Sequence, residues 1–326
     1  MTDTNARQST PTQPTPTQPT PTQPTQTWRD SDLLFDFRHS PLAIGAVVVT
    51  LLLFVTAIGA PWIAPYDVVD PAKFNVVDAR LPPGSTGMFG GHYLLGTDPQ
   101  GRDLLSAMIY GLRTSLLVGF GSIVLAAFVG ITLGLVSGYF GGFIGAVIMR
   151  VADVQLSFPA ILVALLIDGI TRTVMAREAH ERLAIPVLIL AISASYWVQY
   201  ARTVRSLVLV ERDKEYVLAA KVTGVSTGRI LISHVLPNVL GPVLVIATIN
   251  LSLAILTEAT LSFLGVGVPP GQPSLGSLVR IGNEYLFSGD WWISILPGAV
   301  LVALCLAVNL LGDWLRDALN PKLAGT

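Results

Sequence analysis

Long uncharged stretches alternate with polar connections along most of this chain. The first stretch, residues 39–66, contains no Asp, Glu, Lys or Arg. An apolar helix needs about 20 residues to cross a bilayer, and the centre of this stretch, 42–60, is close to that length. Trp62 and Tyr66 close the stretch, and aromatic side chains favour the membrane–water interface. The pattern predicts a first membrane span.

A second uncharged stretch, 114–149, is too long for one span, and the turn-rich segment 137–142 (SGYFGG) divides it into two antiparallel spans. Gly130, Gly134 and Gly138 recur every four residues, which predicts close helix–helix packing on that face. Residues 95–113, just before this stretch, alternate charged turns with apolar positions, a pattern typical of a helix lying in the membrane interface.

The second of these two antiparallel spans covers about 143–167, and three further spans are predicted at about 184–201, 238–264 and 291–312. The expected fold is therefore an all-α integral membrane protein with six transmembrane helices. An even count puts both termini on one side. With the termini and residues 211–237 assigned to the cytoplasm, 12 Lys and Arg residues lie inside and 8 outside, which agrees with the positive-inside rule and predicts an N-in, C-in topology.

Composition supports a membrane protein. The chain has 326 residues, of which 13% are charged, and its mean hydropathy is +0.62, whereas soluble domains carry about a quarter charged residues. A net charge of -1 argues against a nucleic-acid partner. One cysteine, Cys305, excludes an internal disulfide framework and a Cys-rich metal site. No metal ligand set is expected.

The chain divides into two regions. Residues 10–27 repeat a Thr/Pro/Gln pattern that blocks helices and sheet ladders and has nothing to bury. We expect residues 1–38 to form a disordered cytoplasmic tail, and residues 39–326 to form the membrane domain.

The segment 211–237 is an exception among the apolar stretches, because it carries seven charged residues. Ala219 and Ala220 favour a helix and add little bulk. Gly224 suits a left-handed helix C-cap, and Ser226 or Thr227 suits the N-cap of a second helix that runs toward Pro237. We expect a helix–turn–helix that offers a docking surface to a partner in the water phase.

Familiar catalytic motifs are missing. No G-x-x-x-x-G-K-[ST] loop occurs, so the usual cradle for ATP phosphates is absent. The motifs H-E-x-x-H, C-x-x-C and G-x-S-x-G are absent as well. A non-catalytic chain is therefore expected.

A few polar side chains fall within the predicted spans. A carboxylate at membrane depth is costly and faces protein or a water-filled path. For Glu258 we favour a packing role near the outer end of its span, with the solute path as the alternative. Asn250 and Asn309 are expected to bond between helices. Asp153 lies near the start of its span, where a charged side chain can bend toward water.

The charged segment resembles the EAA loop of bacterial ABC importer permeases, whose pattern is E-A-A-x3-G-x9-I-x-L-P. Ala219, Ala220, Gly224, Leu236 and Pro237 match it, whereas Leu218 replaces its glutamate and His234 its isoleucine. Three further stretches are similar to the C-type subunit of the dipeptide/oligopeptide/nickel branch: 95–119, 257–270 and 291–321. The resemblance covers about 39–322.

This resemblance implies a type I ABC importer permease fold in the bacterial cytoplasmic membrane, forming half of a path for di- or oligopeptides. The implied partners are a second homologous permease, two cytosolic ABC ATPase subunits or domains, and an extracytoplasmic solute-binding protein. ATP and Mg would be bound by the ATPases and not by this chain. The residues implied to couple to the ATPases are Glu215, Ala219, Ala220, Gly224, Leu236 and Pro237. Nickel, glutathione or another small solute is the alternative cargo within this family.

Two other classes remain open at this point. An ion-coupled secondary transporter would use Glu258 and Asp153 as coupling sites, although no inverted repeat of broken helices is evident. A membrane enzyme would need a cluster of polar catalytic groups, which the sequence does not supply.

Overall fold

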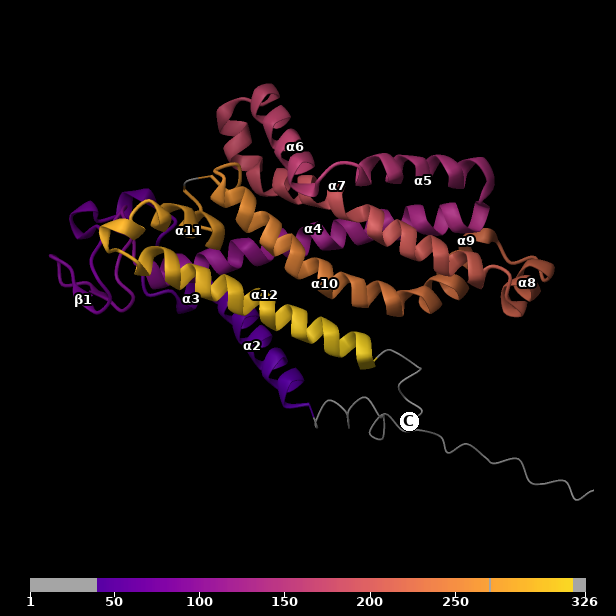
Figure 1. The fold of residues 1–326 in the computed structure, drawn as a ribbon, viewed down its shortest axis with the longest axis horizontal. Helices are drawn as coiled ribbons and strands as arrows, with labels where there is room; N and C mark the ends of the chain where they lie inside the picture. The colour runs from indigo at the N-terminus through magenta and orange to yellow at the C-terminus, as the bar shows by residue number, and fades with distance from the viewer. Residues whose placement is uncertain (1–39, 270, 319–326) are drawn as a thin grey trace, which may run out of the picture.

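The computed structural model describes residues 40–269 and 271–318, so the predicted tail at 1–38 lies outside the described part of the chain. Long helices run side by side in an elongated bundle (Figure 1). Five of these described helices are long and apolar enough to cross a membrane, and the predicted six are reached if the bent pair α5–α6 counts as one span.

The helices that form the bundle are α2 (Pro41–Ile58), α3 (Ala60–Ile63), α4 (Leu104–Phe140), α5 (Gly142–Leu156), α6 (Ala160–Val174), α7 (Arg177–Glu211), α10 (Leu236–Phe263) and α12 (Trp292–Ala318). Shorter elements lie at the two ends of the bundle. The hairpin strands β1 (Ser85–Thr86) and β2 (His92–Tyr93) and helix α11 (Leu275–Asn283) lie at one end. Helices α8 (Glu215–Val222) and α9 (Thr227–Arg229) lie at the other end (Figure 1).

The prediction of an interfacial helix over 95–113 is wrong. Residues 104–113 are the first turns of α4, which continues without a break to Phe140. The Asp103 carboxylate caps this helix by accepting the Ser106 N–H at 2.8 Å. The apolar side chains of these turns are buried because they pack on α11 and α12: Leu104 and Ala107 are 0% exposed and join a cluster with Leu278. These turns are amphipathic, as the pattern indicated, but their apolar side is covered by protein rather than by lipid.

The third predicted span, 143–167, is not one straight helix. It is divided into α5 and α6, which meet at an angle of 92°. Ser157 is the C-cap of α5, and Pro159 is the N-cap of α6. Proline has no backbone N–H and disfavours a helical conformation in the residue before it, so the helix stops at this point. The segment between this span and the next, 168–183, is largely helical, since α6 continues to Val174 and α7 begins at Arg177.

The predicted glycine face is confirmed as a close contact between α4 and α7. A Cβ atom at Gly130 would lie 2.5 Å from the carbonyl oxygen of Trp197. At Gly134 it would lie 2.7 Å from Cβ of Val204, and at Gly138 2.8 Å from Cβ of Val208. Real Cβ atoms do not approach other atoms so closely, so glycine at these positions lets the two helices touch.

The connection from α3 to α4 is structured rather than open. It contains η1 (Pro71–Lys73), η2 (Val76–Asp78) and the antiparallel β1–β2 hairpin. The buried Asp78 carboxylate organises it by accepting the Tyr93 hydroxyl at 3.1 Å and the Met88 N–H at 2.8 Å. Burial, together with this hydrogen bond, raises the pKa of Tyr93 to about 12, so Tyr93 remains a donor at neutral pH. A further short helix, η4 (Leu286–Ser288), lies between α11 and α12.

We predict that Gly134→Ala destabilises the protein by about 1–3 kcal/mol, the usual cost of overpacking, because the added methyl meets backbone and a β-branched side chain. Gly45→Ala in α2 is the matched control, since nothing lies within 4 Å of a Cβ there, and it should be neutral or slightly stabilising. The check is thermal unfolding of the purified protein in detergent. Equal midpoints for the two variants would contradict the close packing.

Candidate functional site

The charged segment forms a helix that ends at a glycine turn, as predicted. Helix α8 spans Glu215–Val222, and Gly224 follows with φ of 79°. The N–H of Val225 donates to the carbonyl of Ala220 at 3.0 Å, and that of Gly224 to the carbonyl of Lys221 at 3.1 Å. This pair of bonds is the Schellman arrangement, which requires a left-handed residue and therefore favours glycine. Gly224 fixes the direction in which the chain leaves α8.

The second predicted helix exists but is not separate from the following span. Ser226 occupies the N-cap position of α9 without a side-chain hydrogen bond. Helix α9 passes into the π-helical η3 (Ile230–Val235) and then into α10. Leu236 and Pro237 begin α10; Leu236 is half-buried and Pro237 is exposed. Because proline cannot donate a backbone hydrogen bond, it suits this change of helix type.

One face of α8 is buried in the main core. Val217 is 0% and Ala220 is 8% exposed. Both belong to the same apolar cluster as Val208 of α7 and Val235 of η3, with Leu135 of α4 also in it. The core of the bundle therefore continues without interruption into the charged segment.

Polar contacts fix α8, and the turn that leads into it, to three neighbours. In that turn the guanidinium of Arg212, the C-cap of α7, donates to the Gly138 carbonyl of α4 at 3.1 Å. The Tyr216 hydroxyl donates to the Glu211 carboxylate at the end of α7 and accepts from the Asn238 amide of α10 at 3.1 Å. Burial and the bond to Glu211 raise the pKa of the Tyr216 hydroxyl, which keeps it protonated as a donor. A displacement of α8 would therefore be transmitted to α4, α7 and α10.

The opposite face of α8 is open and partly apolar. Glu215 and Ala219 are exposed, Leu218 is 47% exposed and Val222 is 88% exposed. Leu218 and Val222 are four residues apart and lie on one side of the helix. Of the residues proposed for coupling, Glu215, Ala219 and Gly224 thus lie at the surface, whereas Ala220 supports the helix from below.

Glu258 lies at a junction of three helices. It is 0% exposed. Its Oε2 accepts the Ser115 hydroxyl of α4 at 2.7 Å, and its Oε1 accepts the Ser262 hydroxyl of α10 at 2.7 Å. The Ser115 oxygen in turn accepts the N–H of Leu275 in the first turn of α11 at 3.3 Å. This geometry favours the packing role over the solute path.

The other polar positions behave differently from one another. Asn250 is 1% exposed and its side chain lies against the Tyr200 hydroxyl of α7, but neither its amide nitrogen nor that hydroxyl has a hydrogen-bond partner among the described residues. Asn309 is exposed on α12. The predicted bonding role of both residues stays a prediction. Asp153 of α5 forms an ion pair with Arg202 of α7, half-exposed on both sides.

Sequence reasoning missed two ion pairs, one fully buried and one with a buried carboxylate and a half-exposed arginine. Asp98 accepts from Nε of Arg102 at 2.6 Å, with both side chains almost fully buried. Asp168 accepts from Nε of Arg172 at 2.5 Å, and Nε2 of His180 lies 3.7 Å from its other oxygen. In both pairs the partners are four residues apart, which was the available signal. The spacing alone did not distinguish a buried pair from a surface pair.

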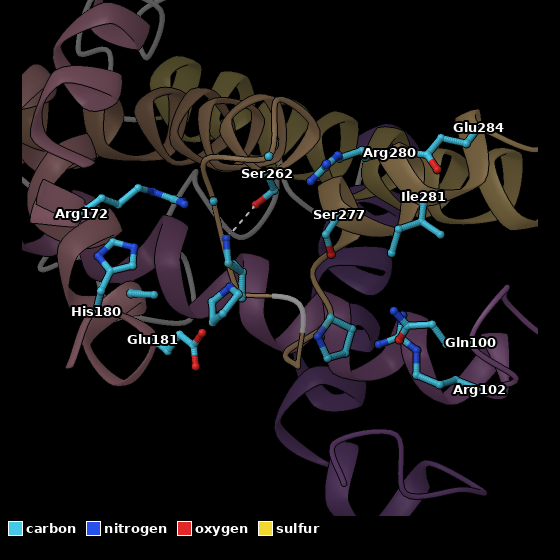
Figure 2. Close-up of a pocket in the computed structure, with 16 residues that line it drawn as sticks. Gln100, Arg102, Arg172, His180, Glu181, Ser262, Ser277, Arg280, Ile281 and Glu284 are labelled. Carbon is cyan, nitrogen blue, oxygen red and sulfur yellow. Dashed lines mark hydrogen bonds between the residues drawn. The ribbon is translucent and has the colours of Figure 1, made fainter. Parts of the chain in front are cut away.

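Arg102, Arg172 and His180 border a cavity of about 580 Å³ at the α11 end of the bundle, far from α8 (Figures 1 and 2). The loop before α4, the end of α6, the start of α7 and α11 all contribute to its walls. Among the described residues, no group of three His, Cys, Asp or Glu side chains is arranged to hold a metal ion.

A bundle of apolar spans that holds one short helix rigidly at its end defines a membrane permease subunit. Residues 130–325 match the family described as "Binding-protein-dependent transport system inner membrane component", and residues 26–83 match "N-terminal TM domain of oligopeptide transport permease C". The chain belongs to this family of inner-membrane components of binding-protein-dependent transport systems.

Relatives agree over nearly the whole length. The chain is 40% identical over 294 residues to the "Di/tripeptide transport system permease protein DppC" of Pseudomonas aeruginosa, covering 88% of this chain and 90% of that one. It is 37% identical over 289 residues to the "Dipeptide transport system permease protein DppC" of Haemophilus influenzae, covering 89% and 93%. It is 33% identical over 296 residues to the "Oligopeptide transport system permease protein OppC" of Bacillus subtilis, covering 91% and 90%.

A solved structure of the MetNI methionine ABC transporter, in an inward-facing conformation, shares the fold. The TM-score is 0.53 at 20% identity, covering 67% of this chain and 98% of that one. The predicted type I permease fold is confirmed. The chain is an ABC importer permease of the bacterial cytoplasmic membrane.

We predict that Glu258→Ala destabilises the protein by about 1–3 kcal/mol, because it leaves the buried Ser115 and Ser262 hydroxyls without their acceptor. Glu258→Gln retains one acceptor oxygen and should cost less. Thr260→Ala is the control on the same helix, because Thr260 is only half-buried and its hydroxyl bonds to its own helix at Leu256. Thermal unfolding of the three variants checks this order, and a Glu258→Ala midpoint equal to that of Thr260→Ala would refute the packing role.

Proposed function

We propose that this chain is one half of the translocation path of a di- or oligopeptide importer, driven by cytosolic ATPases that grip α8. The observation that carries the proposal is the rigid seating of α8: its inner face belongs to the core, while Leu218 and Val222 on its outer face are open to a partner. An exposed apolar strip rimmed by charges is typical of a protein interface. The family supplies ATPase and binding-protein partners in general.

The finer assignment of partners is part of this proposal. We infer a heterodimer with a second, homologous permease, two ATPase subunits or domains that carry ATP and Mg, and a solute-binding protein on the outer side. The charged segment then faces the cytosol, which is the orientation that the 12 to 8 distribution of Lys and Arg favours. Solute arrives at the opposite end, near α11.

In this mechanism α8 transmits force and performs no chemistry. ATP-driven closure of the ATPases moves the two α8 helices of the permease pair. Through Arg212, Tyr216 and the continuous α9–η3–α10 helix, each α8 moves α4, α7 and α10 together. This coupled movement switches access to the path between the two sides of the membrane.

Peptides are the proposed cargo because the relatives described above are di-, tri- or oligopeptide permeases by name. The test is uptake into liposomes by the purified complex with its binding protein. We expect ATP-dependent uptake of labelled dipeptides, and little uptake of nickel or glutathione. Uptake by this chain alone, driven by a proton or sodium gradient, would contradict the proposal.

The ion-coupled alternative gains no support from the polar residues. Asp153 lies half-exposed in an ion pair with Arg202. Glu258 is enclosed by serine hydroxyls. Neither carboxylate borders the cavity at the α11 end.

We predict that Gly224→Val leaves membrane insertion intact but uncouples ATP hydrolysis from transport. A β-branched residue at φ of 79° is strained, so the turn after α8 would open and α8 would lose its direction. Transport should fall at least tenfold, the effect of about 1.4 kcal/mol on the coupled step.

Gly228→Ala is the matched control in the same segment. Gly228 has ordinary helical geometry, and nothing lies within 4 Å of a Cβ placed there. The measurements are ATP hydrolysis and peptide uptake by the same reconstituted complex. Normal uptake by Gly224→Val would show that the turn is not a coupling point.

A further inference from the structure

The cavity at the α11 end carries charges of both signs on three walls. Arg102 comes from the loop before α4, His180 from the start of α7, and Arg280 and Glu284 from α11 and its cap. Figure 2 shows His180 and Glu181 on one side and Arg102 and Arg280 on the other. Its volume of about 580 Å³ falls within the range of small-molecule sites, about 300–1,000 Å³.

Arg280 presents a positive charge that no described carboxylate neutralises. No ion pair or hydrogen bond to its side chain is made by residues 40–269 or 271–318. Its guanidinium lies on the backbone of Gly265, where a Cβ would be only 2.8 Å from Nη1. Gly265 follows the end of α10 with φ of 81°. The negative end of that helix favours a cation at this point, so Arg280 is held in place without losing its charge to a partner.

Two further nitrogen atoms in residues that line the cavity have no partner among the described residues. Arg102 is 2% exposed, and while its Nε pairs with Asp98, its Nη1 is buried without an acceptor there. Nδ1 of His180 is also buried without a partner there. Buried polar atoms are usually satisfied, and an exception calls for an explanation. The two residues come from separate elements that line the same cavity.

By contrast, the other arginine of the cavity is already neutralised. Arg172 is paired with Asp168, which is 2% exposed. Arg102 is likewise paired with Asp98, so the positive charge still available in the cavity is that of Arg280. A carboxylate is the group that best matches planar guanidinium donors.

We propose that this cavity binds a free peptide on its way into the permease, with the peptide's carboxylate on Arg280. The inference rests on the proposed peptide import and names the part of the chain that meets the cargo. Glu284, which lines the same cavity and forms no ion pair with described residues, gives the ammonium group of the peptide a counter-charge. The cavity thus offers a counter-charge to each of the two charged termini of a zwitterionic peptide.

The test uses alkylation of a cysteine placed in the cavity of the complete transporter. Cys305→Ser removes the native thiol, and Ile281→Cys introduces one on the cavity wall. Maleimide labelling is timed without the binding protein, with dialanine, with its C-terminal amide, or with neither. At a concentration ten times its dissociation constant, dialanine should slow labelling about tenfold, as expected for a blocked site, whereas the amide should have little effect.

Arg280→Gln in the same background should abolish protection by dialanine. Lys73→Gln is the control, because Lys73 is a cation outside the cavity that pairs with Asp67; protection should persist in this variant. ATP-dependent dipeptide uptake is measured in parallel with the binding protein present.

The outcomes separate the two proposals. Equal protection by dialanine and its amide, or protection that survives Arg280→Gln, overturns carboxylate recognition. Intact peptide uptake without any protection overturns the cavity as a peptide site and leaves the importer function standing. If the cysteine introduced by Ile281→Cys does not react even without peptide, another subunit fills the cavity, and this result also overturns the inference. A complex that takes up no peptide contradicts the proposed function itself.

Discussion

The contact between α4 and α7 is the constraint on which the rest of the structure depends. Gly130, Gly134 and Gly138 remove the side chains that would otherwise separate these two helices. Membrane helices gain little from burying apolar surface, because lipid is equally apolar, so they associate through close packing instead. The contact ends at Gly138, whose carbonyl accepts Arg212 just before α8. The charged segment is thus attached at the end of this close contact between the two helices.

Much of the fold could be predicted from the sequence because membrane spans leave a strong signal in the pattern. The glycine spacing predicted the α4–α7 contact, and Gly224 predicted the turn, since each depends on one local property of glycine. The interfacial helix at 95–113 was wrong because amphipathicity does not reveal whether lipid or protein covers the apolar side. The bend at Pro159 was also not predicted from the sequence. A proline near the end of a hydrophobic run shows where a helix ends, but it does not show in which direction the next helix leaves.

The candidate sites also differ in how far the sequence alone could predict them. Residues of the coupling segment follow one another in the chain, so a motif could identify them. The cavity joins Arg102, His180 and Arg280, which are far apart in the sequence, and only the folded chain brings them together. The role of Glu258 also needed coordinates, because Ser115 is 143 residues away from it. Charged residues near the outer half are mostly paired or hydrogen-bonded, in keeping with the cost of leaving a buried charge alone.

The length of α4 has a consequence for the membrane in which the protein works. Its 37 residues rise by about 55 Å at 1.5 Å per residue, whereas the hydrocarbon layer is about 30 Å thick. Even at the largest common tilt of about 40°, the helix is too long to fit inside, and α7, with 35 residues, is nearly as long. The paired helices therefore emerge from the lipid. A change in bilayer thickness would move the membrane–water interface along the helices without altering the contacts that hold α8.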